Sequence, residues 1–162
     1  MELENLEKLS ADLGTLLHSK GMFFTAAESC TGGLLSQSIV SVPGSSTWFG
    51  SSFITYSNIS KHKILGVSKD TLNSFGAVSE EVVEEMVAGA LIESRANLGI
   101  AISGIAGPGG GSPERPVGTV CIAWRLNEEQ AIRETFLFQG GRNDVRYQTV
   151  VQALEGAIGL LK

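Results

Sequence analysis

The stretch MFFTAAESCTGGLLSQSIVSV, residues 22–42, changes its hydrophobic pattern once, at a cluster of polar and small residues. Its first six residues are mostly apolar and include two phenylalanines, which predicts a short buried strand. After the cluster, apolar residues follow helical spacing until Pro43, and proline cannot continue a helix. The segment ESCTGG, residues 28–33, is therefore predicted to be a strand-to-helix turn that carries an acid, two hydroxyls and a thiol.

Further helices and strands are predicted on both sides of this turn. Leucines at steps of three and four residues predict a helix over 3–17, and Ser79 with the two glutamates after it predicts the start of another. The remaining predicted elements are a strand over 51–57, short helical or irregular pieces over 58–76, strands over 98–104, 117–124 and 131–138, and a final helix over 143–161.

The order of these elements predicts the fold class. Parallel strands need helical crossovers, which the first half of the chain supplies, whereas the last three strands can form an antiparallel meander. A chain of 162 residues with 43% hydrophobic residues has the size of one ordinary domain. We therefore expect an α/β fold, with residues 1–162 forming a single three-layer α/β/α domain around a mixed, mostly parallel sheet.

Charge and composition argue against several classes of partner. The formal net charge is −5, and the lysines and arginines are scattered rather than gathered into the basic stripe that nucleic-acid binding requires. No apolar run approaches the roughly 20 residues that span a bilayer, and the acidic first ten residues do not resemble a signal peptide. We expect a cytoplasmic protein that binds neither nucleic acid nor membrane.

The few cysteines and histidines argue against a metal centre. Cys30 and Cys121 lie far apart without CxxC spacing, so neither a zinc site nor a disulfide framework is predicted. His18 falls in the first predicted helix and His62 stands alone later in the chain. We expect no metal and no cofactor.

The predicted turn at residues 28–33 is a candidate catalytic site. In open α/β sheets, ligands bind beyond the carboxyl ends of strands, where helix N-termini present unpaired N–H groups. Ser29 and Cys30 would lie at such a helix start, and the glycines that follow would let a ligand approach the backbone. The alternative is purely structural: Ser29 or Thr31 caps the helix and the glycines permit a tight turn.

A nucleophile at this turn needs a base, and the segment TYSNISKHK, residues 55–63, offers several. His62 could complete a serine–histidine pair. Lys61 or Lys63 could serve instead, because burial lowers the pKa of a lysine, and Tyr56 lies at the end of the strand just before them. The alternative for both lysines is a solvated surface.

A long Gly/Pro-rich connection, SGIAGPGGGSPERPVG at residues 103–118, follows one of the predicted strands. It exceeds what two adjacent strands require, and loops of this length often carry function. Its glycines could hold a phosphate, although the segment matches neither the Walker pattern nor GxGxxG. A simple flexible hairpin is the alternative.

Six segments taken together resemble the CinA C-terminal domain family, whose stand-alone members are nicotinamide-nucleotide amidohydrolases. Their order and spacing match the family over nearly the whole chain. The segments are TAAESCTGG, PGSSTWF, TYSNISKHKILGV, GAVSEEVVEEMVAGA, SGIAGPGGGSPERPVGTV and GRNDVR. The resemblance implies hydrolysis of the carboxamide of nicotinamide mononucleotide to nicotinate mononucleotide and ammonia, without a metal.

The resemblance also implies roles for individual residues. Ser29 matches the family's nucleophile, Lys61 the lysine of its Ser-Lys pair, and Tyr56 belongs to the same segment. Arg142 is suited to binding the phosphate, with Lys63 as second candidate and an ordinary surface arginine as the alternative. Further residues expected at the substrate are Glu28, Thr31, Gly32, Gly33, Ser103 and Gly104.

Two further expectations come from comparing the chain with the family. Longer members carry an additional N-terminal domain, which we do not expect here, and a homodimer is expected by analogy. Gly141 stands where we associate an acidic residue with the family, so the role of that carboxylate is open in this chain.

The expected mechanism is an acyl-enzyme route. Ser29 attacks the amide carbon, Lys61 accepts its proton, and backbone N–H groups between Thr31 and Gly33 hold the oxyanion. In one rival hypothesis, Cys30 is the nucleophile with His62 as its base, because a helix N-terminus lowers the pKa of a thiol. In another, the chain is a nucleotide-binding regulatory module that uses the same turn and Arg142 without catalysis.

Overall fold

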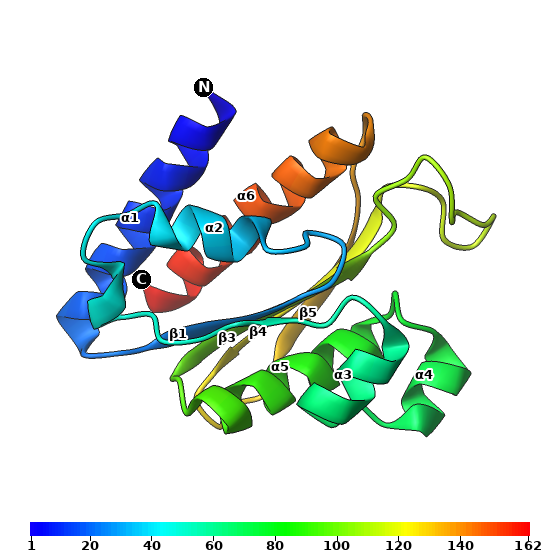
Figure 1. Cartoon of the computed structure of the whole chain (residues 1–162), viewed down its shortest axis with the longest axis horizontal. Coiled ribbons are helices and arrows are strands. Elements are labelled where there is room, and N and C mark those ends of the chain that lie inside the picture. Colours follow the sequence, from blue (N-terminus) through cyan, green and yellow to red (C-terminus); the bar gives the residue numbers. More distant parts are fainter.

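The computed structural model describes all 162 residues and has one five-stranded sheet between two layers of helices (Figure 1). The strands, in the order β2-β1-β3-β4-β5, are β1 (Phe24–Glu28), β2 (Phe53–Ile54), β3 (Leu98–Gly104), β4 (Thr119–Leu126) and β5 (Ile132–Leu137). The helices are α1 (Glu2–Lys20), α2 (Leu34–Val40), the 3-10 turn η1 (Ser45–Thr47), α3 (Asn58–Leu65), α4 (Lys69–Phe75), α5 (Glu80–Ser94) and α6 (Arg142–Leu161). The α/β class and the mixed sheet are confirmed.

The parallel part of the sheet is smaller than expected. Strand β1 pairs in parallel with β2 and β3, whereas β3–β4 and β4–β5 are antiparallel. Parallel pairs are thus half of the pairings rather than most of them. The strand expected over 51–57 is only two residues long, because the chain leaves the edge of the sheet after Ile54 and enters α3.

The side chains of the central strands alternate in size and direction, and this alternation explains the two layers of helices. On β3 and β4, the large side chains of Ile100 and Ile122 enter the core shared with α1, α2 and α6. Ala101 and Ala123 point to the opposite face, where α5 packs with α3 and α4. Because successive strand residues face opposite sides, this pattern separates a face with bulky side chains from a face on which α5 can approach closely.

A close approach of backbones also places α3. A Cβ atom at Gly89, in the middle of α5, would collide with the carbonyl oxygen of Leu65 at the end of α3. Leu65 and Val67 are buried in the same core as Val83 and Met86 of α5. The small residue and this apolar contact together bring α3 against α5, beside the carboxyl end of β1.

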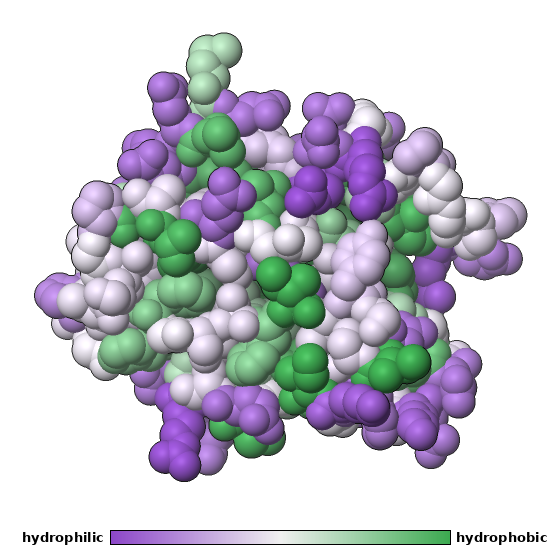
Figure 2. All heavy atoms as spheres, viewed as in Figure 1, coloured by the Kyte–Doolittle hydropathy of each residue, from purple (hydrophilic) through white to green (hydrophobic).

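The surface carries no single apolar face on the side seen in Figure 2. Hydrophilic residues surround the molecule, and hydrophobic ones occur as separate clusters between them. Exposed members of this class include Ile54, Tyr56 and Ile59. None of the helices combines the length and the apolar character that crossing a bilayer requires.

Candidate active site

The turn after β1 lies at the edge of the sheet where its two parallel neighbours also end. The backbone N–H of Ser29 donates to the carbonyl of Ile102 in β3 (3.1 Å), and the N–H of Gly32 donates to the carbonyl of Ser29 (3.0 Å). Gly33, with φ of 103°, adopts the left-handed conformation that glycine tolerates and starts α2. These constraints place Ser29 just outside the carboxyl end of β1, where ligands bind in open α/β sheets.

Lys61 reaches this turn from α3. The Ser57 hydroxyl caps the helix by accepting a hydrogen bond from the N–H of Ser60. The Ser60 hydroxyl in turn accepts one from the N–H of Ser57. Only 1% of Lys61 is exposed, and its Nζ lies 3.0 Å from Ser29 Oγ. The helix start is thus fixed by its cap, and the lysine one residue later projects inward rather than into solvent.

Two backbone carbonyls complete the surroundings of the Lys61 amine. Nζ donates to the carbonyl of Thr55 at 2.9 Å and to that of Tyr56 at 3.3 Å. No carboxylate forms an ion pair with it. Burial lowers the pKa of Lys61 from its ordinary value to about 8, because the charged form loses hydration without gaining a countercharge.

This arrangement has a direct chemical consequence. A neutral amine has two N–H donors and one lone pair. If the two donors serve the carbonyls of Thr55 and Tyr56, the lone pair is directed at the Ser29 hydroxyl. The site can therefore remove a proton from Ser29 once Lys61 is neutral.

The thiol of Cys30 is in a different environment. Cys30 is buried, and burial raises the pKa of its thiol to about 12. A thiolate is the reactive form of cysteine, and this environment suppresses it near neutral pH. His62, the base in the thiol hypothesis, uses Nδ1 to contact the carbonyl of Val67 at 2.8 Å and does not line the cavity at Ser29.

Glu28 does not face the substrate space, contrary to the expectation from sequence. It is fully buried, and its carboxylate accepts the N–H groups of Gly33, Leu35 and Ser36 at 2.9–3.2 Å and the Ser36 hydroxyl at 2.6 Å. A carboxylate satisfies the free N–H groups at a helix N-terminus and is stabilised by its dipole. The side chain therefore fixes the start of α2, and with it the turn that carries Ser29.

Replacing Glu28 by glutamine is expected to lower the free energy of unfolding by about 1.5–3 kcal/mol, because an amide NH₂ would face N–H donors that now share a charged acceptor. Urea denaturation would measure the loss. Ser36→Ala, which removes the hydroxyl contacts to Glu28 and Ser52 but keeps the carboxylate, is the matched control and should cost about 1 kcal/mol. A Glu28→Gln protein as stable as the parent would contradict this role.

A cavity of about 270 Å³ opens in front of Ser29 and Lys61. Its walls come from the β1–α2 turn, the start of α3, the segment before α5, the Gly-rich loop and the start of α6. The lining residues are Ser29, Cys30, Tyr56, Asn58, Lys61, Ala77, Val78, Ser103, Gly104, Ile105, Ala106, Gly107, Gly109, Gly110 and Arg142.

Arg142 joins two walls of this cavity. Its guanidinium donates to the carbonyl of Gly107 (2.7 Å) and to the phenol oxygen of Tyr56 (3.2 Å). Tyr56 thus contacts Lys61 through its backbone carbonyl and Arg142 through its side chain, and no hydrogen bond joins its phenol to Ser29. Arg142 is placed where it can contact a ligand and hold the Gly-rich loop.

Two N–H groups of the turn remain free, and one of them, that of Thr31, is among the expected oxyanion donors. Gly32 donates to Ser29 and Gly33 to Glu28, so neither is available for an oxyanion. The N–H groups of Cys30 and Thr31 donate no hydrogen bond within the protein, and Cys30 lines the cavity. The candidate oxyanion donor is therefore the N–H of Cys30, next to Ser29, because the N–H groups of the two glycines already donate within the protein.

The other expected residues do not all line the cavity at Ser29. Ser103 and Gly104 line it, whereas Thr31 is fully buried and does not. Lys63 is absent from this cavity and lines one between α3 and α4. A helix turns by about 100° per residue, so Lys61 and Lys63 cannot face the same side.

Arg146, which was not predicted as a site residue, also positions the turn. Its Nε donates to the carbonyl of Cys30 (3.2 Å) and its Nη2 to that of Thr31 (2.7 Å). It stands four residues after Arg142 on α6, a spacing that places both on one helix face and could have revealed it. Asn58, Ala77 and Val78 also line the cavity, and no pattern in the sequence marked them.

The glycine at position 141 has a simple structural role. Its N–H donates to Asp144 Oδ2 at 2.7 Å, at the start of α6. The carboxylate that caps this helix is therefore supplied three residues later in the chain.

No cluster of three or more His, Cys, Asp or Glu side chains is arranged to hold a metal ion.

Comparisons with known proteins place this fold and site in context. The family model described as CinA C-terminal domain matches residues 6–161. The nicotinamide-nucleotide amidohydrolase PncC of Enterobacter agglomerans is 46% identical over 98% of this chain and 96% of its own length. The protein of that name from Escherichia coli K12 is 47% identical over 93% of this chain and 91% of its own.

The structural comparison agrees with the sequence comparison. The competence/damage inducible protein CihA from Agrobacterium tumefaciens superposes with a TM-score of 0.95 at 40% identity, covering 98% of this chain and 96% of that one. Similarity in sequence and in fold thus extends over nearly the whole chain.

Proposed function

The chain belongs to the CinA C-terminal domain family, and from this premise we propose that it hydrolyses the carboxamide of nicotinamide mononucleotide to nicotinate mononucleotide and ammonia. The amidohydrolase names of relatives at 46–47% identity over most of both chains support this reaction. The observation that carries the mechanism is the 3.0 Å contact between the buried Lys61 amine and Ser29 Oγ.

In the first half of the reaction, Ser29 Oγ attacks the carboxamide carbon while its proton passes to Lys61 Nζ. The N–H of Cys30 stabilises the oxyanion of the tetrahedral intermediate. Lys61 then gives its proton to the amide nitrogen as the C–N bond breaks, so ammonia leaves and an ester on Ser29 remains. Serine and lysine together thus replace the amide bond by a more reactive ester.

In the second half, water attacks the ester and gives a proton to Lys61. The amine returns that proton to Ser29 Oγ as the acyl bond breaks, which releases the nicotinate product and restores the site. The carbonyls of Thr55 and Tyr56 keep Nζ oriented in both halves. These steps require only water and groups of this chain.

The reaction is tested by mixing the purified protein with nicotinamide mononucleotide, measuring ammonia and identifying nicotinate mononucleotide by chromatography. Production of both in equal amounts would support the proposal. Saturable binding of the mononucleotide without ammonia would instead support the regulatory module.

We also propose that Arg142 binds the substrate's phosphate. It lines the cavity at Ser29 from the start of α6, and a guanidinium can form paired hydrogen bonds to phosphate. A contact remote from the amide contributes mainly to binding rather than to the chemical step.

Replacing Arg142 by alanine is expected to raise KM for nicotinamide mononucleotide about tenfold or more, because a charged hydrogen bond is lost. Nicotinamide riboside lacks the phosphate, so its KM should change little. Steady-state kinetics with both compounds measure the difference, and Arg142→Lys, which keeps the charge, should lose less. Equal effects on the two substrates would remove Arg142 from phosphate recognition and leave it as the residue that holds Tyr56 and the Gly-rich loop.

A further inference from the structure

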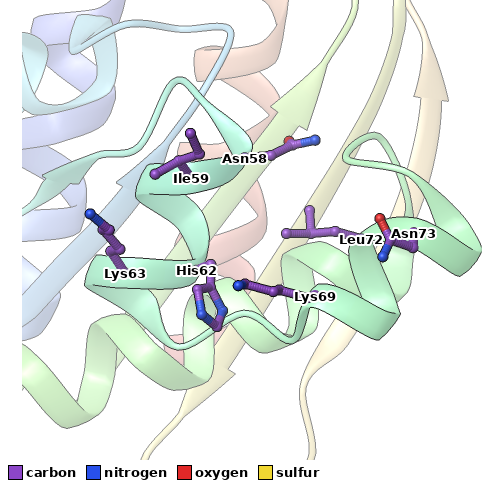
Figure 3. Close-up of a pocket in the computed structure, with 7 residues that line it drawn as sticks. All are labelled: Asn58, Ile59, His62, Lys63, Lys69, Leu72 and Asn73. Atoms are coloured by element: carbon purple, nitrogen blue, oxygen red, sulfur yellow. The ribbon is translucent and has the colours of Figure 1, made fainter.

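A second cavity lies between α3 and α4 (Figure 3). Its volume is about 260 Å³, and its lining residues are Asn58, Ile59, His62, Lys63, Lys69, Leu72 and Asn73. The side chains of Leu72, which is buried, and Ile59, which is exposed, form its apolar part, and amide and basic groups surround the rest. The proposed catalytic steps use none of these side chains.

The charge of this cavity is unusual for an acidic protein. Two lysines, a histidine and two asparagines line it, and no carboxylate does, although the chain carries a formal net charge of −5. Neither Lys63 nor Lys69 takes part in any of the ion pairs of the structure. The carboxylate of Glu85, which lies near the start of α4, accepts the N–H of Ser68. The cavity is therefore lined by basic groups and by no carboxylate, and the two lysines are exposed to solvent.

Two of these basic groups converge. Figure 3 shows Lys69 extending from α4 toward His62 of α3, whereas Lys63 points away from Lys69. His62 Nδ1 lies 2.8 Å from the carbonyl of Val67, and a carbonyl can only accept, so Nδ1 donates. This contact orients the ring and leaves Nε2 without a partner in the protein, and Nε2 of the protonated ring can donate to a phosphate oxygen. An anion between Lys69 and His62 would pair with the Lys69 ammonium and bridge the two helices.

We propose that the α3–α4 cavity is a binding site for a phosphate group, with Lys69 and His62 as its principal ligands and Asn58 and Asn73 as additional donors. Lysine binds phosphate as a compact point charge, and amide NH₂ groups complement its oxygens. Asn58 lines both this cavity and the one at Ser29, so the two sites are neighbours. The phosphate is either the single phosphate of nicotinamide mononucleotide, which would then bind here instead of at Arg142, or it belongs to a separate phosphorylated ligand.

The chain's two histidines allow a direct test, because His18 lies on α1 and serves as an internal control. The ring signals would be followed by ¹H–¹³C NMR during titration with inorganic phosphate, with sodium chloride at matched ionic strength as reference and His18→Gln to assign them. We expect a saturable shift of His62 alone, and Lys69→Ala should weaken half-saturation about tenfold. Lys20→Ala, an exposed lysine on α1, is the matched control and should leave the titration unchanged.

This NMR titration tests the proposed phosphate site independently of catalysis. No shift of His62, equal shifts of both histidines, or an unchanged titration in Lys69→Ala would overturn it. Failure to hydrolyse nicotinamide mononucleotide would instead overturn the proposed function and leave this site untouched.

Kinetics then distinguish the two sources of the phosphate. If Lys69→Ala raises KM for nicotinamide mononucleotide but not for nicotinamide riboside, the substrate carries the phosphate. If inorganic phosphate changes turnover of the riboside by the parent protein but not by Lys69→Ala, the site serves a separate phosphorylated ligand.

Discussion

Ser29→Ala is expected to reduce ammonia release from nicotinamide mononucleotide by about 10³-fold or more, while the protein folds as before. The hydroxyl is the only group at the cavity that contacts the Lys61 amine and can form an acyl intermediate. Folding should change little, because one hydrogen bond worth about 1 kcal/mol is lost. Ammonia assays and thermal unfolding, performed on the same preparations, measure the two effects.

Cys30→Ala is the matched control for this substitution, because it alters the next residue of the same turn. It should retain activity, since burial raises the pKa of the thiol to about 12 and the proposed oxyanion donor is a backbone N–H that alanine keeps. An inactive Cys30→Ala protein together with an active Ser29→Ala protein would replace the serine mechanism by the thiol mechanism. Mass spectrometry of the intact protein during turnover would show which residue carries the acyl group.

Lys61→Arg is expected to be nearly as inactive as Ser29→Ala, although it keeps the positive charge. A guanidinium is not deprotonated in a protein, so it cannot accept the Ser29 proton. Lys61 is buried and the larger side chain can disturb packing, so Lys61→Met, which is neutral and of similar volume, serves as a second variant. Both should be inactive, whereas Lys20→Arg at an exposed site of α1 should not differ from the parent protein.

The pH dependence of the parent enzyme provides an independent test of the same role. Below the pKa of Lys61, about 8, the amine is protonated and cannot act as a base; above it, the amine is neutral. The value of kcat/KM should therefore rise with pH and level off above about 8, falling roughly tenfold per pH unit on the acidic side. A flat profile, or full activity in Lys61→Met, would show that the base lies elsewhere.

Much of the fold could be predicted from local patterns. The turn at 28–33, the amphipathic helices and the three late strands follow from hydrophobic period, helix caps and proline, which act over a few residues. The edge strand β2 was overestimated, because an apolar run does not reveal how many of its residues find a partner. The share of parallel pairs was overestimated with it.

At the candidate site, the amino-acid sequence alone establishes which reactive groups are present and predicts that Ser29 and Cys30 share a turn. It left Lys61, His62 and Lys63 open as bases, and only the resemblance to a family favoured Lys61. The tertiary structure decided that Lys61 faces Ser29, because Leu65 and Val67 pack α3 against α5 and thereby set the rotation of the helix. It also decided that Glu28 holds the start of α2 and that Cys30 is buried. These outcomes depend on contacts between segments far apart in the chain, and the direction and hydration of a side chain follow from such packing rather than from its neighbours in sequence.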